Sequence, residues 1–344
     1  MADTNTTYDD PLHIGIDLGT SRSAVAASRG KRKLVESYVG WPKDFVAQKM
    51  HGKKPLFGRN ALDHRLSLNL VRPLENGVLK TGTELEAKST GELIGHLVSL
   101  AEPSKDQKIC AAVGVPAEAL KVNRRAIREA VSQYADELII VSEPFAVAYG
   151  LAELDNAMVI DIGAGTIDFC IMHGTTPSAE DQRGLSTAGD YVDRKLYDYI
   201  KENHPEADFT INMVRQIKEE HAFIGKTKSK VEVELPVDST PTKFDVTSEL
   251  STACESMAAA ISETAMELIG RFDPEFQDRV KQNIILAGGG SQIKGLPEYL
   301  QEAMSDLGTC EFQVVEDPLF AGADGTLELV NDMPAKYWQD NDSR

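Results

Sequence analysis

The sequence predicts an α/β fold built from two similar halves. Short apolar runs that are typical of strands alternate with helical patterns along the 344 residues, which indicates sheets covered by helices. One local pattern also occurs twice. An apolar run ends in Asp17 and continues into Gly19, and a second run ends in Asp161 and continues into Gly163. This repeat predicts two halves that begin near residues 12 and 157 with strand, turn and strand.

The first half is expected to alternate strands with amphipathic helices. Its strand-prone runs are His13–Asp17, Ala24–Ser28, Ile109–Val115 and Leu138–Val141, and its helical patterns are Thr90–Ala101 and Val122–Tyr134. In the second helix, residues at helical spacing form one apolar stripe, namely Ala126, Ile127, Ala130, Val131 and Tyr134.

The second half repeats this organisation. Its strand-prone runs are Met158–Ile162, Phe169–Met172 and Ile284–Ala287, and its helical patterns are Tyr191–Asn203 and Ser248–Arg271. Apolar and polar residues alternate in two short stretches between residues 226 and 247, which predicts a small peripheral sheet with one face in water.

Composition narrows the classes of partner. The chain has 36 Lys and Arg against 54 Asp and Glu, a net charge of −18, which disfavours nucleic acid and anionic lipid. No apolar stretch is long enough to span a bilayer, and the polar, acidic start resembles neither a signal peptide nor an amphipathic anchor, so we expect no direct membrane insertion. Cys110 and Cys170 lie in strand-like runs and no CxxC occurs, so reduced buried thiols and a cytoplasmic location are expected.

The two Asp-Gly turns do not match the common nucleotide loops. No GxxxxGK[ST] sequence is present, which excludes a P-loop. The stretch GAGTID has Asp168 where a dinucleotide fingerprint needs its third glycine, and the β-prone residues FCIM follow in place of a helix.

A hairpin turn of Gly, Thr and Ser can instead bind phosphate through successive backbone N–H groups. Two such turns that face each other would hold a polyphosphate from both sides. Asp17 and Asp161 would repel phosphate but can hold Mg²⁺ through its water shell. The alternative is that each turn is an ordinary tight hairpin with an Asp cap.

A third glycine run, ILAGGGSQIKGLP, follows the strand Ile284–Ala287. Its glycines admit a flat group against the backbone. The alternative is a flexible connection between a strand and a helix. Glu143 precedes Pro144, which is also the pattern of an ordinary helix start with Ser142 as N-cap.

Five segments of the chain together match a known pattern: GIDLGTS, VSEPFAVAYGL, VIDIGAGTID, LAGGGSQIKGLPEYL and DPLFAGADGTLELV. In this order they resemble the nucleotide-site motifs of the actin/Hsp70/sugar-kinase superfamily. Three further stretches, VRPLENGVL, VGVPAEALKVNRRAIREA and VRQIKEEHAFIG, are similar to bacterial actins of the MreB type. Together these matches cover nearly the whole chain. The combination of GIDLGTS, SRGK, VGWPKD, DIGAGT and the ending MPAKYW most resembles the actin-like proteins that organise magnetosomes.

The resemblance implies an actin-like two-domain fold in which two duplicated, RNase H-like mixed-sheet halves surround a nucleotide cleft. Domain I would comprise residues 1–150 and 321–344, with a small insertion at about 36–75. Domain II would comprise residues 151–320, with an insertion at about 190–250. The hinges would lie near Glu143–Gly150 and Phe320–Gly325.

The resemblance also implies site residues. Glu143 would position or activate the attacking water, and Asp161 would act with it. Asp17 and Asp161 would orient Mg²⁺ through water. The residues expected to bind ATP or ADP are Asp17, Gly19, Thr20, Ser21, Gly163, Ala164, Gly165, Thr166, Gly189, Lys218, Glu219, Gly288, Gly289, Gly290 and Ser291.

Two residues depart from the related proteins. Ile167 stands where MreB-type proteins commonly have a second Thr that helps to hold the attacking water, so slower hydrolysis is expected. Arg22 is the nearest candidate for the Lys that actins carry beside the first phosphate loop. The MreB membrane-binding N-terminal helix is also missing from the sequence, which argues against direct lipid attachment.

These expectations describe a cytoplasmic, cytoskeletal ATPase that polymerises with itself and meets magnetosome-associated adaptor proteins, with Mg²⁺ and ATP or ADP as cofactors. The alternative from the same superfamily is a small-molecule kinase of the sugar or acetate type, for which the sequence shows no substrate-binding signature.

Overall fold

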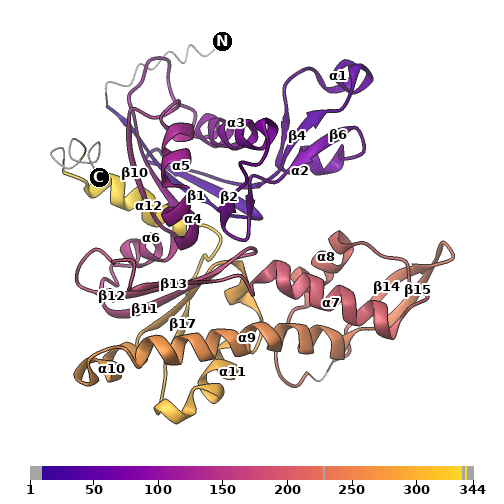
Figure 1. Ribbon diagram of the computed structural model, residues 1–344, viewed down its shortest axis with the longest axis vertical. Coiled ribbons are helices and arrows are strands. Elements are labelled where there is room, and N and C mark those ends of the chain that lie inside the picture. Colours follow the sequence, from indigo (N-terminus) through magenta and orange to yellow (C-terminus); the bar gives the residue numbers. More distant parts are fainter. Residues whose placement is uncertain (1–9, 228, 335–337, 339–344) are drawn as a thin grey trace.

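The computed structural model describes residues 10–227, 229–334 and 338, and it contains two five-stranded sheets of the same topology. In the first sheet the strand order is β10-β9-β1-β2-β3, and in the second it is β13-β12-β11-β16-β17. Figure 1 shows one half above the other, with helices packed on each sheet. The predicted duplicated α/β architecture is confirmed.

The first sheet begins with two antiparallel hairpins and ends with two parallel strands. Its strands are β1 Leu12–Leu18, β2 Arg22–Ala27, β3 Lys31–Glu36, β9 Ile109–Val115 and β10 Glu137–Ser142. Strand β1 pairs antiparallel with β2 and parallel with β9, so the Asp17 end of β1 lies beside the turn into β2. Ile14, Ile16 and Leu18 are fully buried and fix which face of β1 meets the core.

The second sheet repeats this pairing. Its strands are β11 Asp155–Ile162, β12 Ile167–His173, β13 Gln182–Leu185, β16 Ile284–Ala287 and β17 Phe312–Val314. Strand β11 pairs antiparallel with β12 and parallel with β16, and its buried residues Met158, Ile160 and Ile162 correspond to those of β1. Both Asp-Gly turns therefore occupy the same place in their halves.

Helices cover both sheets. They are α3 Glu84–Leu100, α4 Ala117–Val122, α5 Arg124–Val131, α6 Glu143–Gly150, α7 Gly189–Asn203, α8 Ile211–His221, α9 Thr247–Ile269, α10 Pro274–Lys281, α11 Leu296–Ala303 and α12 Ala321–Asp332, with short 3₁₀ turns at Gly289–Gln292 and Ser305–Leu307. Helix α3 starts six residues before the predicted Thr90, because Thr83 and Glu86 form a capping box there.

The helix predicted over Val122–Tyr134 is present as α5, but with shorter bounds, Arg124–Val131. The chain forms α4 and α5 with Asn123 between them at φ −117°, ψ 2°. The Asn123 side chain accepts a hydrogen bond from the Leu79 N–H at 3.0 Å, which favours the break because it uses the amide in a tertiary contact.

Two small inserted regions project to the same side of the molecule, the right of Figure 1. The first holds the three-stranded sheet β5-β4-β6 and two short helices, with bounds β4 Val39–Pro42, α1 Phe45–His51, β5 Leu56–Phe57, α2 Gly58–Asp63 and β6 Leu68–Val71. It is followed by the hairpin β7 Leu74–Glu75 and β8 Val78–Leu79. The second contains α7, α8 and the antiparallel pair β14 Glu232–Val237 and β15 Thr240–Asp245, which confirms the predicted peripheral sheet.

Helices α6 and α12 lie between the two halves (Figure 1). Each follows the last strand of a sheet, and each is associated with an acid–proline pair: Glu143-Pro144 forms the start of α6, and Asp317-Pro318 precedes α12. A Cβ atom on Gly325 would lie 1.9 Å from the Ala146 carbonyl oxygen, so the two helices touch through their backbones. Their position fits the predicted hinges, and the two-domain division of the chain stays a prediction.

The four cysteines, Cys110, Cys170, Cys254 and Cys310, are free and buried, as predicted for the first two. Within residues 10–227, 229–334 and 338, no helix combines the length and apolar character needed to cross a membrane.

Candidate functional site

A cleft of about 600 Å³ lies between the two halves, a volume typical of small-molecule sites. It is lined by both Asp-Gly turns, by the third glycine run and by Glu143, and its far wall includes Gly189, Lys218 and Glu219. Fourteen of the predicted nucleotide-binding residues line it, together with Glu143. The exception is Ser291, whose buried hydroxyl donates to the Gly288 carbonyl at 2.8 Å and so supports the turn from behind.

The two hairpin turns meet inside the cleft. A Cβ atom on Gly165 would lie 2.4 Å from the Thr20 hydroxyl oxygen, so only glycine permits this approach of the second turn to the first. Among the described residues, the Thr20 hydroxyl has no hydrogen-bond partner although it is buried. A buried polar atom without a partner at such a contact is suited to bind a ligand oxygen.

Three carboxyl groups gather beside these turns. Glu143 begins α6, and its carboxyl shares a hydrogen bond with Asp17 at the end of β1. Burial raises the pKa of Asp17 from 3.8 to about 7. Burial also raises the pKa of Glu143 and of Asp161 well above their usual ranges, and the neighbouring carboxylates add to both shifts. The site therefore favours protonation, or a cation, in place of three uncompensated charges.

A fourth buried acid, Asp168, was not assigned a role from the sequence. Its Oδ1 accepts the backbone N–H of Ala117 at 2.9 Å, which links the second turn to the first half of the molecule. Burial raises its pKa to about 6. A charged residue within the apolar run TIDFCIM is the signal that could have revealed it.

The third glycine run closes one wall of the cleft. Gly288 has φ +72°, and a Cβ there would lie 2.4 Å from Asp161 Oδ1. Both the backbone conformation and the close approach require glycine at this position. The run continues as a 3₁₀ turn, Gly289–Gln292, before α11 begins at Leu296.

Charged side chains form the opposite wall. Lys218 on α8 donates to the Gly189 carbonyl at 2.7 Å and pairs with the buried Asp193 at 2.6 Å, so its ammonium group is held in place. Arg22 pairs with Glu219 across the cleft at 2.7 Å. Arg22, the candidate for the Lys that actins carry beside the first phosphate loop, is therefore paired with Glu219, a residue predicted to border the nucleotide.

Ile167 occupies the position of the missing Thr. Its side chain is fully buried in the core of the second half, beneath the turn that Thr166 ends. Because isoleucine has no hydroxyl to hold the attacking water, hydrolysis is expected to be slow, and this expectation stays a prediction.

The residues present fit a nucleotide with Mg²⁺. Glycines leave room on three walls, and the Thr20 hydroxyl and Glu143 Oε1 are buried polar atoms without partners among the described residues. Within those same residues no group of three His, Cys, Asp or Glu side chains is arranged to bind a metal directly. A cation here would depend on water and phosphate oxygens for most of its ligands, which is how Mg²⁺ commonly binds.

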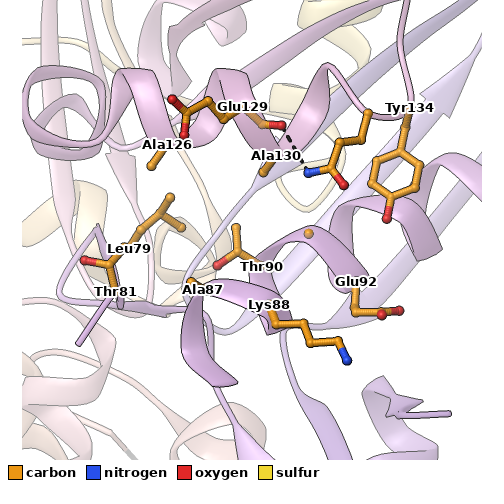
Figure 2. A pocket seen from close by; sticks show the side chains of 12 residues that line it. Leu79, Thr81, Ala87, Lys88, Thr90, Glu92, Ala126, Glu129, Ala130 and Tyr134 are labelled. Atoms are coloured by element: carbon orange, nitrogen blue, oxygen red, sulfur yellow. Dashed lines mark hydrogen bonds between the residues drawn. The ribbon is translucent and has the colours of Figure 1, made fainter. Parts of the chain in front are cut away.

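A smaller cavity, of about 290 Å³, lies between α3 and α5. Figure 2 shows Thr90 of α3 on one side of it and Ala126 and Ala130 of α5 on the other. It lacks glycine turns and buried carboxyl groups. The larger cleft is therefore the better candidate for the functional site.

A model of the MreB/Mbl protein family matches residues 11–337. The chain belongs to this family. Among curated members, the actin-like protein MamK of Paramagnetospirillum magneticum is 40% identical over 95% of this chain and 94% of its own length. MamK of Magnetospirillum gryphiswaldense is 39% identical over 95% of this chain and 91% of its own length.

Solved structures confirm the actin-like fold. The MamK double helical filament superposes with a TM-score of 0.92 at 39% identity, covering 94% of this chain and 100% of that one. A non-polymerising MamK mutant bound to AMPPNP gives a TM-score of 0.75 over the same shares. MreB 5 of Spiroplasma citri bound to AMPPNP, at 19% identity and a TM-score of 0.77 over 97% of this chain and 98% of its own, supports the fold alone.

Proposed function

We propose that this MreB/Mbl-family chain binds ATP with Mg²⁺, hydrolyses it and polymerises with itself into actin-like filaments. The observation that carries this proposal is the contact between the two glycine turns, with Asp17, Asp161 and Glu143 beside it. Such an arrangement can hold a phosphate chain from both sides and place an acid next to it.

In this proposal the backbone N–H groups of Gly19–Ser21 and Gly163–Thr166 hold the phosphates, and the third glycine run holds the adenosine. Magnesium, when bound, neutralises phosphate charge. Asp17 and Asp161 would hold its water shell, and neutralisation also lowers the cost of keeping these acids ionised. Glu143 has one oxygen without a partner in the part of the chain that the structure describes, and it would orient a water molecule and accept its proton.

Filament formation is supported by the similarity to a MamK filament subunit over almost the entire chain. Head-to-tail addition of such subunits is a heterologous contact that does not close on itself. By analogy with the MamK relatives we propose that the filament lies along magnetosomes in the cytoplasm and meets adaptor proteins there.

The decisive experiment combines pelleting and phosphate release at increasing protein concentration with ATP and Mg²⁺. We expect that pelleting begins only above a critical protein concentration. We also expect that phosphate release requires Mg²⁺. If the protein transferred phosphate to a sugar or to acetate and formed no polymer, this proposal would be wrong and the small-molecule kinase would be the better assignment.

A further inference from the structure

We propose that Arg72 is a positioning residue that holds the two phosphate-binding turns in register. This inference rests on the proposed ATPase function. Arg72 follows β6 at the end of the first inserted region, and the structure gives it contacts to both halves of the molecule. It does not line the cleft, so any effect on ATP would pass through other residues.

On one side Arg72 holds the first turn. Its Nε donates to the Thr20 carbonyl oxygen at 2.7 Å. Thr20 is the residue whose buried hydroxyl faces Gly165, so the position of this backbone carbonyl sets the contact between the turns.

On the other side Arg72 holds the second turn through α7. Its Nη1 lies 2.7 Å from Asp190 Oδ2, and both side chains are mostly buried. The backbone N–H of Asp190 donates to the Ala164 carbonyl at 2.7 Å, and that of Gly189 donates to the Gly163 carbonyl at 3.1 Å. The start of α7 and the second turn are therefore joined, and Arg72 connects them to the first turn.

The planar guanidinium group suits this role because it donates in two fixed directions at once. A lysine could keep the charge but would not reproduce both hydrogen bonds. Arg215 also pairs with Asp190, through Oδ1 at 3.3 Å, so Asp190 keeps a cationic partner when Arg72 is removed. Loss of Arg72 should then loosen the register of the turns without leaving a buried acid alone.

The test compares Arg72→Met and Arg72→Lys with a control, Arg59→Met. Arg59 is an exposed arginine of the same inserted region, and it forms an ion pair along its own helix with Asp63. We expect Arg72→Met to lower kcat for ATP by about 10²-fold with KM little changed, because small misplacements in a site cost that much. The kcat of Arg72→Lys should lie between those of Arg72→Met and the parent, and the kcat of Arg59→Met should equal that of the parent.

A second readout is hydrogen exchange at the Gly189 and Asp190 amides in the AMPPNP complex, with thermal unfolding as the check on folding. Faster exchange at these amides in both Arg72 variants, but not in Arg59→Met, would support the inference. This holds even if the parent protein does not hydrolyse ATP, because absence of hydrolysis would overturn only the proposed function. If Arg72→Met does not fold, Arg72→Lys decides. Parent-like kcat and parent-like exchange in the folded variants would overturn the inference.

Discussion

At the scale of single residues, the cleft concentrates acids that burial keeps from ionising freely. Asp17, Glu143 and Asp161 come from the ends of two strands and the start of a helix, and each has a raised pKa because of burial. These carboxyl groups are therefore ionised at neutral pH only when a cation compensates their charge, and without one they favour the protonated, neutral form.

We predict that Glu143→Ala keeps ATP binding nearly intact but slows phosphate release by roughly 10²–10⁴-fold, because a proton-accepting or water-positioning group contributes about that much. Filaments should then accumulate and turn over slowly. Glu143→Gln is the matched control for lost packing, and it should be as slow. Phosphate release at the parent rate in either variant would remove Glu143 from the catalytic assignment.

Asp161→Ala should weaken Mg²⁺-dependent hydrolysis more than it weakens nucleotide binding, because its carboxylate is proposed to act on the cation. A titration of Mg²⁺ at fixed ATP measures the first effect, and a fluorescent nucleotide measures the second. Equal hydrolysis rates of the parent with and without Mg²⁺ would contradict the role assigned to the two aspartates.

The contribution of Asp17 to the stability of the metal-free protein should fall as pH rises from about 4 to about 7 and level off above that. The pKa of Asp17 is raised from 3.8 to about 7 on folding, so the folded state binds more protons in this window and ionisation costs stability. Urea unfolding in EDTA across this range tests the sign, and Asp17→Asn should flatten the slope. A free energy of unfolding that rises steadily with pH in EDTA would contradict the raised pKa of Asp17 in the metal-free protein.

Sequence reasoning reached most of the residues of this site because glycines and acids at strand ends are conspicuous. It did not reach Arg72, Asp190 or Asp168, whose roles depend on partners more than 50 residues away in the chain. It also could not tell that Ser291 points behind its turn, because that depends on how the 3₁₀ turn closes.

At the scale of elements, α6 and α12 form the central contact between the halves. Gly150 and Gly325 face each other, since a Cβ on Gly150 would lie 2.8 Å from the Gly325 Cα. Helices that touch through their backbones leave no space for a side chain.

Gly325→Ala should therefore destabilise the fold by about 1–3 kcal/mol, the usual cost of overpacking, although alanine favours helix on an open surface. Gly91→Ala is the matched control on α3, where an added Cβ meets no atom within 4 Å. Urea unfolding of both variants makes the comparison. Equal stability of Gly325→Ala and the parent would mean that the helices can separate without cost.

Strands with strong periodicity were predictable, and short edge elements were not. Strands β3, β13 and β17 lie at sheet edges, and their sequences, KRKLVE, QRGL and FQV, carry little apolar signal. Their pairing with a neighbouring strand decides their conformation. The break at Asn123 likewise follows from a tertiary hydrogen bond, which periodicity does not reveal.

At the scale of the whole molecule, the duplicated topology was predictable because one motif occurs twice. The net charge of −18 acts at the same scale, since stacking subunits brings like charges together.

We predict that monovalent salt promotes polymerisation in the low range, because the Debye length shortens from roughly 30 Å at 0.01 M to about 10 Å at 0.1 M. Millimolar Mg²⁺ should promote it further and favour bundles. Pelleting or light scattering across a salt series with ATP measures this. A critical concentration that rises from the lowest salt onward would mean that attractive ion pairs between subunits outweigh net repulsion.

The acid–proline pairs at the start of α6 and before α12 lie in different surroundings. Glu143 is buried at the cleft, whereas its counterpart Asp317 is half exposed and pairs with Arg32 at 2.7 Å. The acid of the first pair is thus proposed to accept a proton at the cleft, whereas the acid of the second pair belongs to a surface ion pair. If Glu143 acts as proposed, water would reach a bound phosphate chain from the α6 side of the cleft, so a duplicated fold would carry a catalytic acid in one half only.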